Sequence, residues 1–199
     1  MNLPNKLTLS RLAFAVVIFG LLEWIRRLEI AADDSSLPLL SVIALVLFVI
    51  AAITDAVDGY IARKQNLATA FGRVADPLMD KIIISGMLVF FVSIPSTADL
   101  VPAWMVALIL VREFLMTGLR GFIEGSGSGF GARIFGKLKM VLQCFMVCYT
   151  LFHIGFLADS DASRMIVSLF MWGTLIATLA SGASYFQSAL TVFRDAKDL

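Results

Sequence analysis

Residues 55–80 of the chain read DAVDGYIARKQNLATAFGRVADPLMD and hold four aspartates in an otherwise apolar protein. Asp55 and Asp58 are three residues apart, and Asp76 and Asp80 are four apart, so each pair shares one face of a helix. Two such helices facing each other would place four carboxylates around a small volume. Because buried carboxylates repel one another unless positive charge neutralises them, the stretch predicts a site for hard divalent cations.

Small residues accompany these carboxylates. Gly59 and Ala62 lie about one and two turns beyond Asp55 on the same helix face. Side chains this small would let a bulky phosphate compound, clamped by metal ions, approach the backbone closely. The alternative is that the aspartates are solvated loop charges or ion-pair partners of the basic residues nearby, which are Arg63, Lys64, Arg73 and Lys81.

The composition is that of an integral membrane protein. Of 199 residues, 59% are hydrophobic and only 16% are charged, and the mean hydropathy is +0.90. We expect an all-α integral membrane protein that forms one domain over residues 1–199. The net charge of +1 gives no indication of a nucleic-acid partner.

A helix that crosses a bilayer needs about 20 mainly apolar residues. Six stretches predict six transmembrane helices: Leu7–Arg26, Leu37–Arg63, Phe71–Ile94, Pro102–Glu124, Arg133–Leu157 and Ser163–Phe193. The third is long enough to cross only if it includes Asp76 and Asp80. The aspartates are therefore expected in a polar cavity at one membrane face, where charged groups usually mark a function.

Basic residues predict the orientation, because Lys and Arg collect on the cytoplasmic side of membrane proteins. One set of connections holds Lys6, Arg11, Arg63, Lys64, Arg73, Arg120, Arg133, Lys137, Lys139, Arg194 and Lys197. The other set holds Glu29, Asp33, Asp34, Asp99, Asp159 and Asp161, with Arg26, Arg27 and Arg164 as exceptions. Both termini and the aspartate site are therefore expected in the cytoplasm.

Further polar residues fall on the cytoplasmic side. Arg112 and Arg120 are eight residues apart and share a helix face, and Glu113 could orient an arginine from another helix. Lys137 and Lys139 open the fifth predicted helix. Four cations near bound metals favour a second, anionic ligand, and the alternative is contact with lipid phosphates.

Three smaller predictions concern isolated residues. Thr8 could cap the first helix, and Asn5 could form a hydrogen bond with a ligand. The alternative, that this segment serves only as a helix cap and an interfacial anchor, explains the residues equally well. Cys144 and Cys148 are neighbours along one helix, which argues against a disulfide. His153, the single histidine, is expected to have a structural or interfacial role.

The pattern Asp-x2-Asp-Gly-x2-Ala-Arg-x8-Gly-x3-Asp-x3-Asp over residues 55–80 resembles the signature of the CDP-alcohol phosphotransferase family at every fixed position. The opening Asn5-x-Leu-Thr-x-x-Arg11 is similar to the N-terminal segment of that family. Arg-Glu-x5-Leu-Arg from Arg112, and Gly-Lys-x-Lys ending at Lys139, resemble its phosphatidylglycerophosphate synthase branch. The glycine-rich link over residues 125–131 is the least family-like part.

The resemblance implies transfer of a phosphatidyl group from CDP-diacylglycerol to glycerol 3-phosphate, with release of CMP, by a homodimer in the bacterial inner membrane. It implies two Mg²⁺ ions, with Mn²⁺ as a substitute, held by Asp55, Asp58, Asp76 and Asp80, the last of which is also the general base. The implied CDP-diacylglycerol contacts are Asn5, Thr8, Asp58, Gly59, Ala62, Arg63 and Gly72. The implied acceptor phosphate contacts are Arg112, Arg120, Lys137 and Lys139.

Two other functions remain open on the sequence. The acceptor could be inositol phosphate, serine or another alcohol, although a neutral acceptor would not need the basic residues. The carboxylates could instead form a divalent-cation pathway in a transporter, but no carboxylate near the membrane midplane would continue that path.

Overall fold

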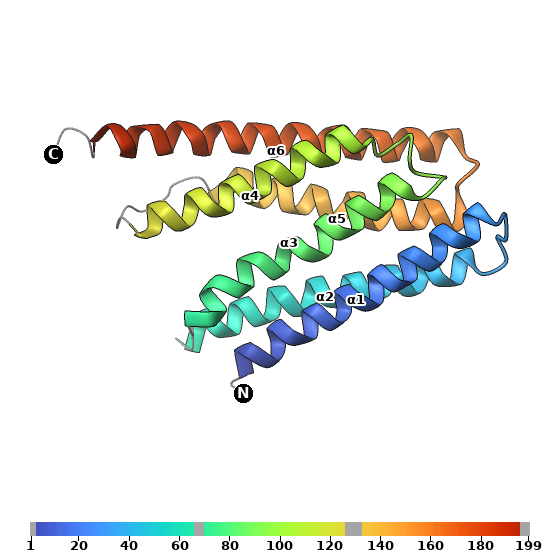
Figure 1. Ribbon diagram of the computed structural model, residues 1–199, viewed down its shortest axis with the longest axis horizontal. Helices are drawn as coiled ribbons and strands as arrows, with labels where there is room; N and C mark the ends of the chain where they lie inside the picture. Colours follow the sequence, from blue (N-terminus) through green and yellow to red (C-terminus); the bar gives the residue numbers. More distant parts are fainter. Residues whose placement is uncertain (1–2, 66–69, 126–132, 196–199) are drawn as a thin grey trace.

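The computed structural model describes the backbone of residues 3–65, 70–125 and 133–195 and the side chains of residues 10–54, 81–118 and 138–183. Within this part of the chain the backbone forms six helices and no strand (Figure 1). The helices are α1 Leu3–Ile30, α2 Leu37–Gln65, α3 Ala70–Ser93, α4 Ala103–Gly125, α5 Arg133–Phe156 and α6 Asp161–Asp195. The predicted all-α fold is confirmed, and each helix overlaps one predicted stretch.

The turn between α1 and α2 shows how local sequence ends one helix and begins the next. Ala32 has a φ of 54°, in the left-handed region that terminates helices. Asp33 Oδ1 then accepts hydrogen bonds from the backbone N–H and the hydroxyl of Ser35, at 3.2 and 2.6 Å. α2 begins at Leu37, and Pro38 follows in its first turn, where the missing N–H is tolerated.

α5 lies in the middle of the bundle and packs against α2, α3 and α6. α1 packs against α2 and α3, and α4 packs against α3 and α6. Between the helices, large side chains such as Phe91, Met87, Ile18, Met146 and Met171 are completely buried. In a membrane these side chains stabilise the bundle mainly by close packing, because lipid tails are as apolar as the residues themselves.

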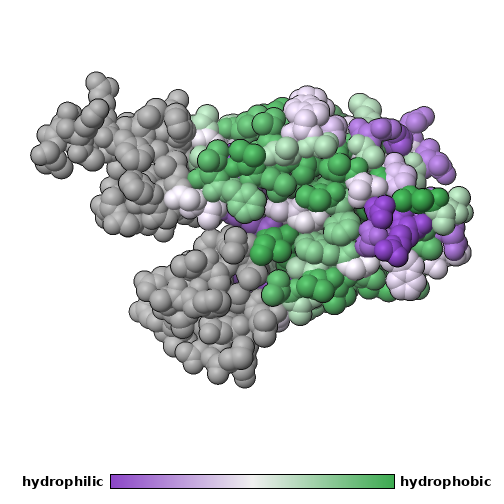
Figure 2. Space-filling view, in the orientation of Figure 1, coloured by the Kyte–Doolittle hydropathy of each residue, from purple (hydrophilic) through white to green (hydrophobic). Residues whose placement is uncertain are grey.

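The outer surface is apolar. Side chains such as Val16, Leu39, Leu115, Met165 and Ile176 are more than 60% exposed, and the face in Figure 2 shows hydrophobic residues over the middle of the bundle. Three helices in the described part of the chain are long and apolar enough to cross a membrane, over Leu37–Thr54, Leu138–Phe156 and Asp161–Ala183. The chain is therefore a membrane protein, because lipid is the solvent that suits such a surface.

Helix direction alternates along the chain, so the helix ends that carry the aspartates and most of the basic residues lie at one end. α1 begins, α2 ends, α3 begins, α4 ends, α5 begins and α6 ends at the left of Figure 1. We call this the site end, because the backbone of residues 55–65 and 70–80 lies there. The turns that follow α1, α3 and α5 lie at the opposite end.

Candidate active site

α2 and α3 carry the four aspartates at the site end. Asp55 and Asp58 lie in the last turns of α2, and Asp76 and Asp80 lie in α3, which begins at Ala70. The predicted helical spacing is confirmed, since each pair lies on one continuous helix. The side chains of these residues are outside the described ones, so the convergence of the carboxylates stays a prediction.

Other predicted contacts are placed only by the helix that carries them, and their side chains also lie outside the described residues. They are Asn5 and Thr8 on α1, Gly59, Ala62 and Arg63 on α2, Gly72 on α3, Arg120 on α4 and Lys137 on α5. The prediction that Thr8 caps the first helix is wrong. α1 already begins at Leu3, so Thr8 lies in the second turn, where backbone N–H groups bond within the helix.

A buried carboxylate lies at the centre of the described part of the site. Glu113 of α4 is 5% exposed, and its Oε1 accepts hydrogen bonds from Nζ of Lys139 on α5 and from Nη1 of Arg112, the latter at 3.2 Å. Its other oxygen, Oε2, lies 4.0 Å from Nζ of Lys81 on α3. One carboxylate thus gathers three cationic groups from three helices. We call these four residues the Glu113 cluster.

Two hydroxyl groups extend the Glu113 cluster. Lys81 Nζ donates to Thr117 Oγ1 and, at 3.3 Å, to the backbone carbonyl of Glu113, which also accepts a hydrogen bond from the Thr117 hydroxyl at 2.8 Å. Arg112 Nη2 donates at 2.8 Å to Ser181 Oγ on α6. The network therefore joins α3, α4, α5 and α6.

The sequence anticipated this cluster only in part. Arg112 and Lys139, two of the four predicted acceptor contacts, come together because both bind the same carboxylate, and their role in binding the acceptor stays a prediction. Glu113 was expected to orient an arginine from another helix. Among the described residues, its nearest cationic partner on another helix is instead a lysine, Lys139. The position of Lys81 between Glu113 and Thr117 was missed, although its place directly after Asp80 was a signal that it lies beside the site.

Charge can be buried here because it is paired. Arg112, Glu113 and Lys139 are each at most 9% exposed, and an ion in such surroundings is stable only with counter-charges and hydrogen bonds. Cations that converge in a partly dry site can also bind phosphate, since arginine offers paired donors and lysine a compact positive charge. The cluster is chemically suited to an anionic ligand.

The aspartates suit a divalent cation by their chemistry. Among the described residues, no group of three His, Cys, Asp or Glu side chains could hold a metal ion. The stretch over residues 55–80, which lies outside that search, offers four carboxylates and neither imidazole nor thiolate. Oxygen-only donors of this kind fit Mg²⁺ or Mn²⁺ better than zinc or copper.

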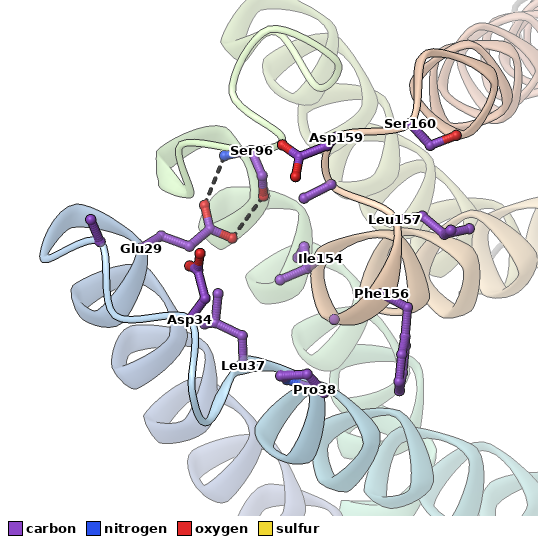
Figure 3. A pocket seen from close by; sticks show the side chains of 13 residues that line it. Glu29, Asp34, Leu37, Pro38, Ser96, Ile154, Phe156, Leu157, Asp159 and Ser160 are labelled. Atoms are coloured by element: carbon purple, nitrogen blue, oxygen red, sulfur yellow. Dashed lines mark hydrogen bonds between the residues drawn. The ribbon is translucent and has the colours of Figure 1, made fainter.

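A cavity at the opposite end of the bundle has a different character. It has a volume of about 730 Å³ and is lined by the turns that follow α1, α3 and α5. Figure 3 shows Glu29, Asp34 and Asp159 among its lining residues, with Glu29 accepting hydrogen bonds from the backbone N–H and hydroxyl of Ser96 at 2.8 and 2.7 Å. No basic side chain is among the described residues that line it. The cavity is therefore unsuited to phosphate-bearing ligands.

Two minor predictions about α5 can be checked. His153 is completely buried near the opposite end, and its Nδ1 lies 2.8 Å from Ser163 Oγ on α6, which fits the structural role expected for it. Cys144 and Cys148 are thiols and form no disulfide, as expected.

The fold and the site define an all-helical membrane protein with an acidic signature on two helices beside a buried basic cluster. The chain belongs to the CDP-alcohol phosphatidyltransferase family, whose sequence profile matches residues 1–180. The match includes the aspartate stretch and the whole Glu113 cluster. The family resemblance seen in the sequence is confirmed.

Known relatives share most of this length. The chain is 41% identical over 189 residues, 93% of each protein, to the CDP-diacylglycerol–glycerol-3-phosphate 3-phosphatidyltransferase of Bacillus subtilis (strain 168). It is 34% identical to the protein of the same name from Rickettsia bellii (strain RML369-C), over 96% of this chain and 97% of that one. It is 33% identical to a probable phosphatidylglycerophosphate synthase of Mycobacterium tuberculosis (strain ATCC 25618 / H37Rv), over 95% of this chain and 82% of that one.

Proposed function

We propose that the chain transfers the phosphatidyl group of CDP-diacylglycerol to glycerol 3-phosphate, giving phosphatidylglycerophosphate and CMP for phospholipid biosynthesis. The observation that carries the proposal is the 41% identity to the Bacillus subtilis protein of that name over 93% of both chains. The four-aspartate signature and the buried basic cluster support it independently, because the reaction needs metal-assisted phosphoryl chemistry and an anion-binding site.

The proposed setting is the bacterial inner membrane, crossed six times by a single domain over residues 1–199. Both termini and a polar cavity at the site end would face the cytoplasm, in line with the basic residues of the connections. At this interface the acyl chains of the donor can remain in lipid while its nucleotide reaches water. A homodimer is proposed from the family resemblance alone.

In this proposal Asp55, Asp58, Asp76 and Asp80 hold two Mg²⁺ ions, or Mn²⁺ in their place. Bound there, such ions would polarise the pyrophosphate of the donor and offset the negative charge on the departing CMP. The small residues Gly59, Ala62 and Gly72 would leave room for the nucleotide. Arg63, Asn5, Thr8 and Asp58 complete the proposed donor contacts.

Asp80 is the proposed general base. A hydroxyl oxygen of glycerol 3-phosphate attacks the phosphorus that carries the diacylglycerol. A new P–O bond forms, the P–O bond to CMP breaks with its electron pair on CMP, and the hydroxyl proton passes to Asp80. A carboxylate is a weak base, so Asp80 would contribute mainly by accepting the proton at the correct position.

Arg112, Arg120, Lys137 and Lys139 would bind the acceptor phosphate. The support for this assignment is that Arg112 and Lys139 bind the same carboxylate from different helices. That carboxylate also faces Lys81, which follows the proposed metal ligand Asp80 on α3. A phosphorylated acceptor would use these cations, whereas serine or another neutral alcohol would not.

The test is release of CMP from CDP-diacylglycerol by the purified protein in detergent with Mg²⁺. Glycerol 3-phosphate, inositol phosphate, serine and glycerol are compared as acceptors, and we expect release with glycerol 3-phosphate alone. Release with a different acceptor would retain the metal chemistry and overturn the acceptor assignment. No release with any acceptor, from folded protein, would favour an untested alcohol or the cation-pathway alternative.

A further inference from the structure

We infer that Glu113 is a positioning residue for the acceptor phosphate, which acts through Lys139 and Lys81 and does not touch the substrate. The inference rests on the proposed function. A carboxylate repels a phosphate, so Glu113 cannot itself bind the acceptor. Its effect on binding must pass through the cations that it holds.

The geometry of the Glu113 cluster carries this inference. A lysine amine sits on a flexible stem with many rotamers, and binding a small phosphate requires that amine at one place. Glu113 Oε1 accepts a hydrogen bond from Lys139 Nζ of α5, and Oε2 faces Lys81 Nζ of α3 at 4.0 Å. A single side chain thus sets the positions of two amines that arrive from different helices.

The number and place of the cations favour this role over a purely structural one. A structural ion pair needs one cation for its carboxylate, whereas Glu113 gathers Arg112, Lys139 and Lys81. The cluster also begins one residue after Asp80 on α3, so this part of the cluster is carried by the same helix as the proposed metal ligands Asp76 and Asp80. Without the carboxylate, two buried cations and the partly buried Lys81 would repel one another, and the lysines would rearrange.

The experiment measures KM for glycerol 3-phosphate, KM for CDP-diacylglycerol and kcat for Glu113→Gln, by CMP release in detergent. We expect the acceptor KM to rise roughly tenfold or more, as for the loss of a charge-assisted hydrogen bond, and the donor KM to change less than about twofold. Glu113→Asp keeps the charge and should recover most of the acceptor affinity. Glu23→Gln is the control, because Glu23 also binds more than one cation, here Arg26 and Arg27, but lies towards the opposite end.

A double-mutant cycle tests whether Glu113 acts through Lys139. Lys139→Gln should raise the acceptor KM by itself, and adding Glu113→Gln to it should raise that KM by a clearly smaller factor than in wild type, because only the contact with Lys81 remains to be lost. If Glu113→Gln raises the acceptor KM by the same factor in the wild-type protein and in the Lys139→Gln variant, the inference is overturned. So would a variant with lower thermal stability and lower kcat but unchanged acceptor KM, or equal effects on both substrates.

The two proposals fail in different ways. Wild-type protein that releases no CMP with glycerol 3-phosphate refutes the proposed function before any variant is compared. Wild-type protein that is active, with the variant pattern absent, refutes only the role of Glu113. If Glu113→Gln does not fold, Glu113→Asp still decides, because shortening the side chain should raise the acceptor KM by about threefold and leave the donor KM unchanged.

Discussion

Replacing Thr117 by valine should loosen Lys81 without changing the shape of the side chain. The hydroxyl that is lost accepts a hydrogen bond from Lys81 and donates one to the Glu113 carbonyl at 2.8 Å. A hydrogen bond to a charged group contributes about 1.5–3 kcal/mol. Because the Lys81 side chain is 24% exposed and keeps its 3.3 Å bond to the Glu113 carbonyl, we expect a smaller loss of about 1 kcal/mol.

For a chain of this length, 1 kcal/mol corresponds to a decrease of about 2–4 °C in Tm. The assay is thermal unfolding of the purified variant in one fixed detergent, together with the acceptor KM from CMP release. We expect Tm to decrease and the acceptor KM to increase, since Lys81 would be held less firmly beside the site.

Thr150→Val is the matched control. Thr150 Oγ1 also donates to the carbonyl four residues earlier, that of Met146 at 2.7 Å, but no cation in the described part of the chain donates to it. The difference between the two variants therefore isolates the bond from Lys81. Equal changes in Tm, with the acceptor KM unchanged in Thr117→Val, would refute the reasoning.

Further predictions concern the metal site, the acceptor and the packing. Asp80→Asn should abolish CMP release while CDP-diacylglycerol binding stays measurable, and near-normal turnover would remove Asp80 as the base. Chelation with EDTA should stop the reaction, and added Mg²⁺ should restore it; activity that survives chelation would contradict a metal mechanism. Arg120→Ala should raise KM for the acceptor far more than for the donor, whereas equal effects would assign it elsewhere. Gly86→Ala should lower stability by about 1–3 kcal/mol in thermal unfolding, because its Cβ would lie 2.9 Å from Cε2 of Phe19 and closer to two other ring atoms. Phe19→Ala should rescue it, and Gly20→Ala, which has open space, should have no such cost.

The six helices could be predicted because a helix in lipid requires a mainly apolar stretch, and polar turns separate the six stretches of this chain. The start of α1 could not be placed as well. Asn5 and Lys6 are polar, so the apolar run begins at Leu7, yet the helix begins at Leu3. Pro4 fits a first helical turn, and a helix can continue past the lipid with polar residues.

The site was predictable where its residues share one helix. Spacing along the chain identified the aspartate pairs and the Arg112 segment. Spacing does not show which helices pack together, so it missed Lys81, which contacts Glu113 and Thr117 at separations of 32 and 36 residues. That contact exists because α3 packs against α4, which depends on the shapes of whole helix surfaces.

The Glu113 cluster also bears on how the protein is made. Arg112 and Glu113 lie near the middle of α4, and one charged residue at the centre of a lone helix costs about 2.5–3.5 kcal/mol to insert into a bilayer. Of the two cationic partners that Glu113 has on other helices, Lys81 is synthesised before α4, whereas Lys139 belongs to α5 and is synthesised after it. In the proposed six-helix topology, α4 gains the cation of Lys139 only after α5 has been made, so its stable integration would be coupled to the insertion of α5.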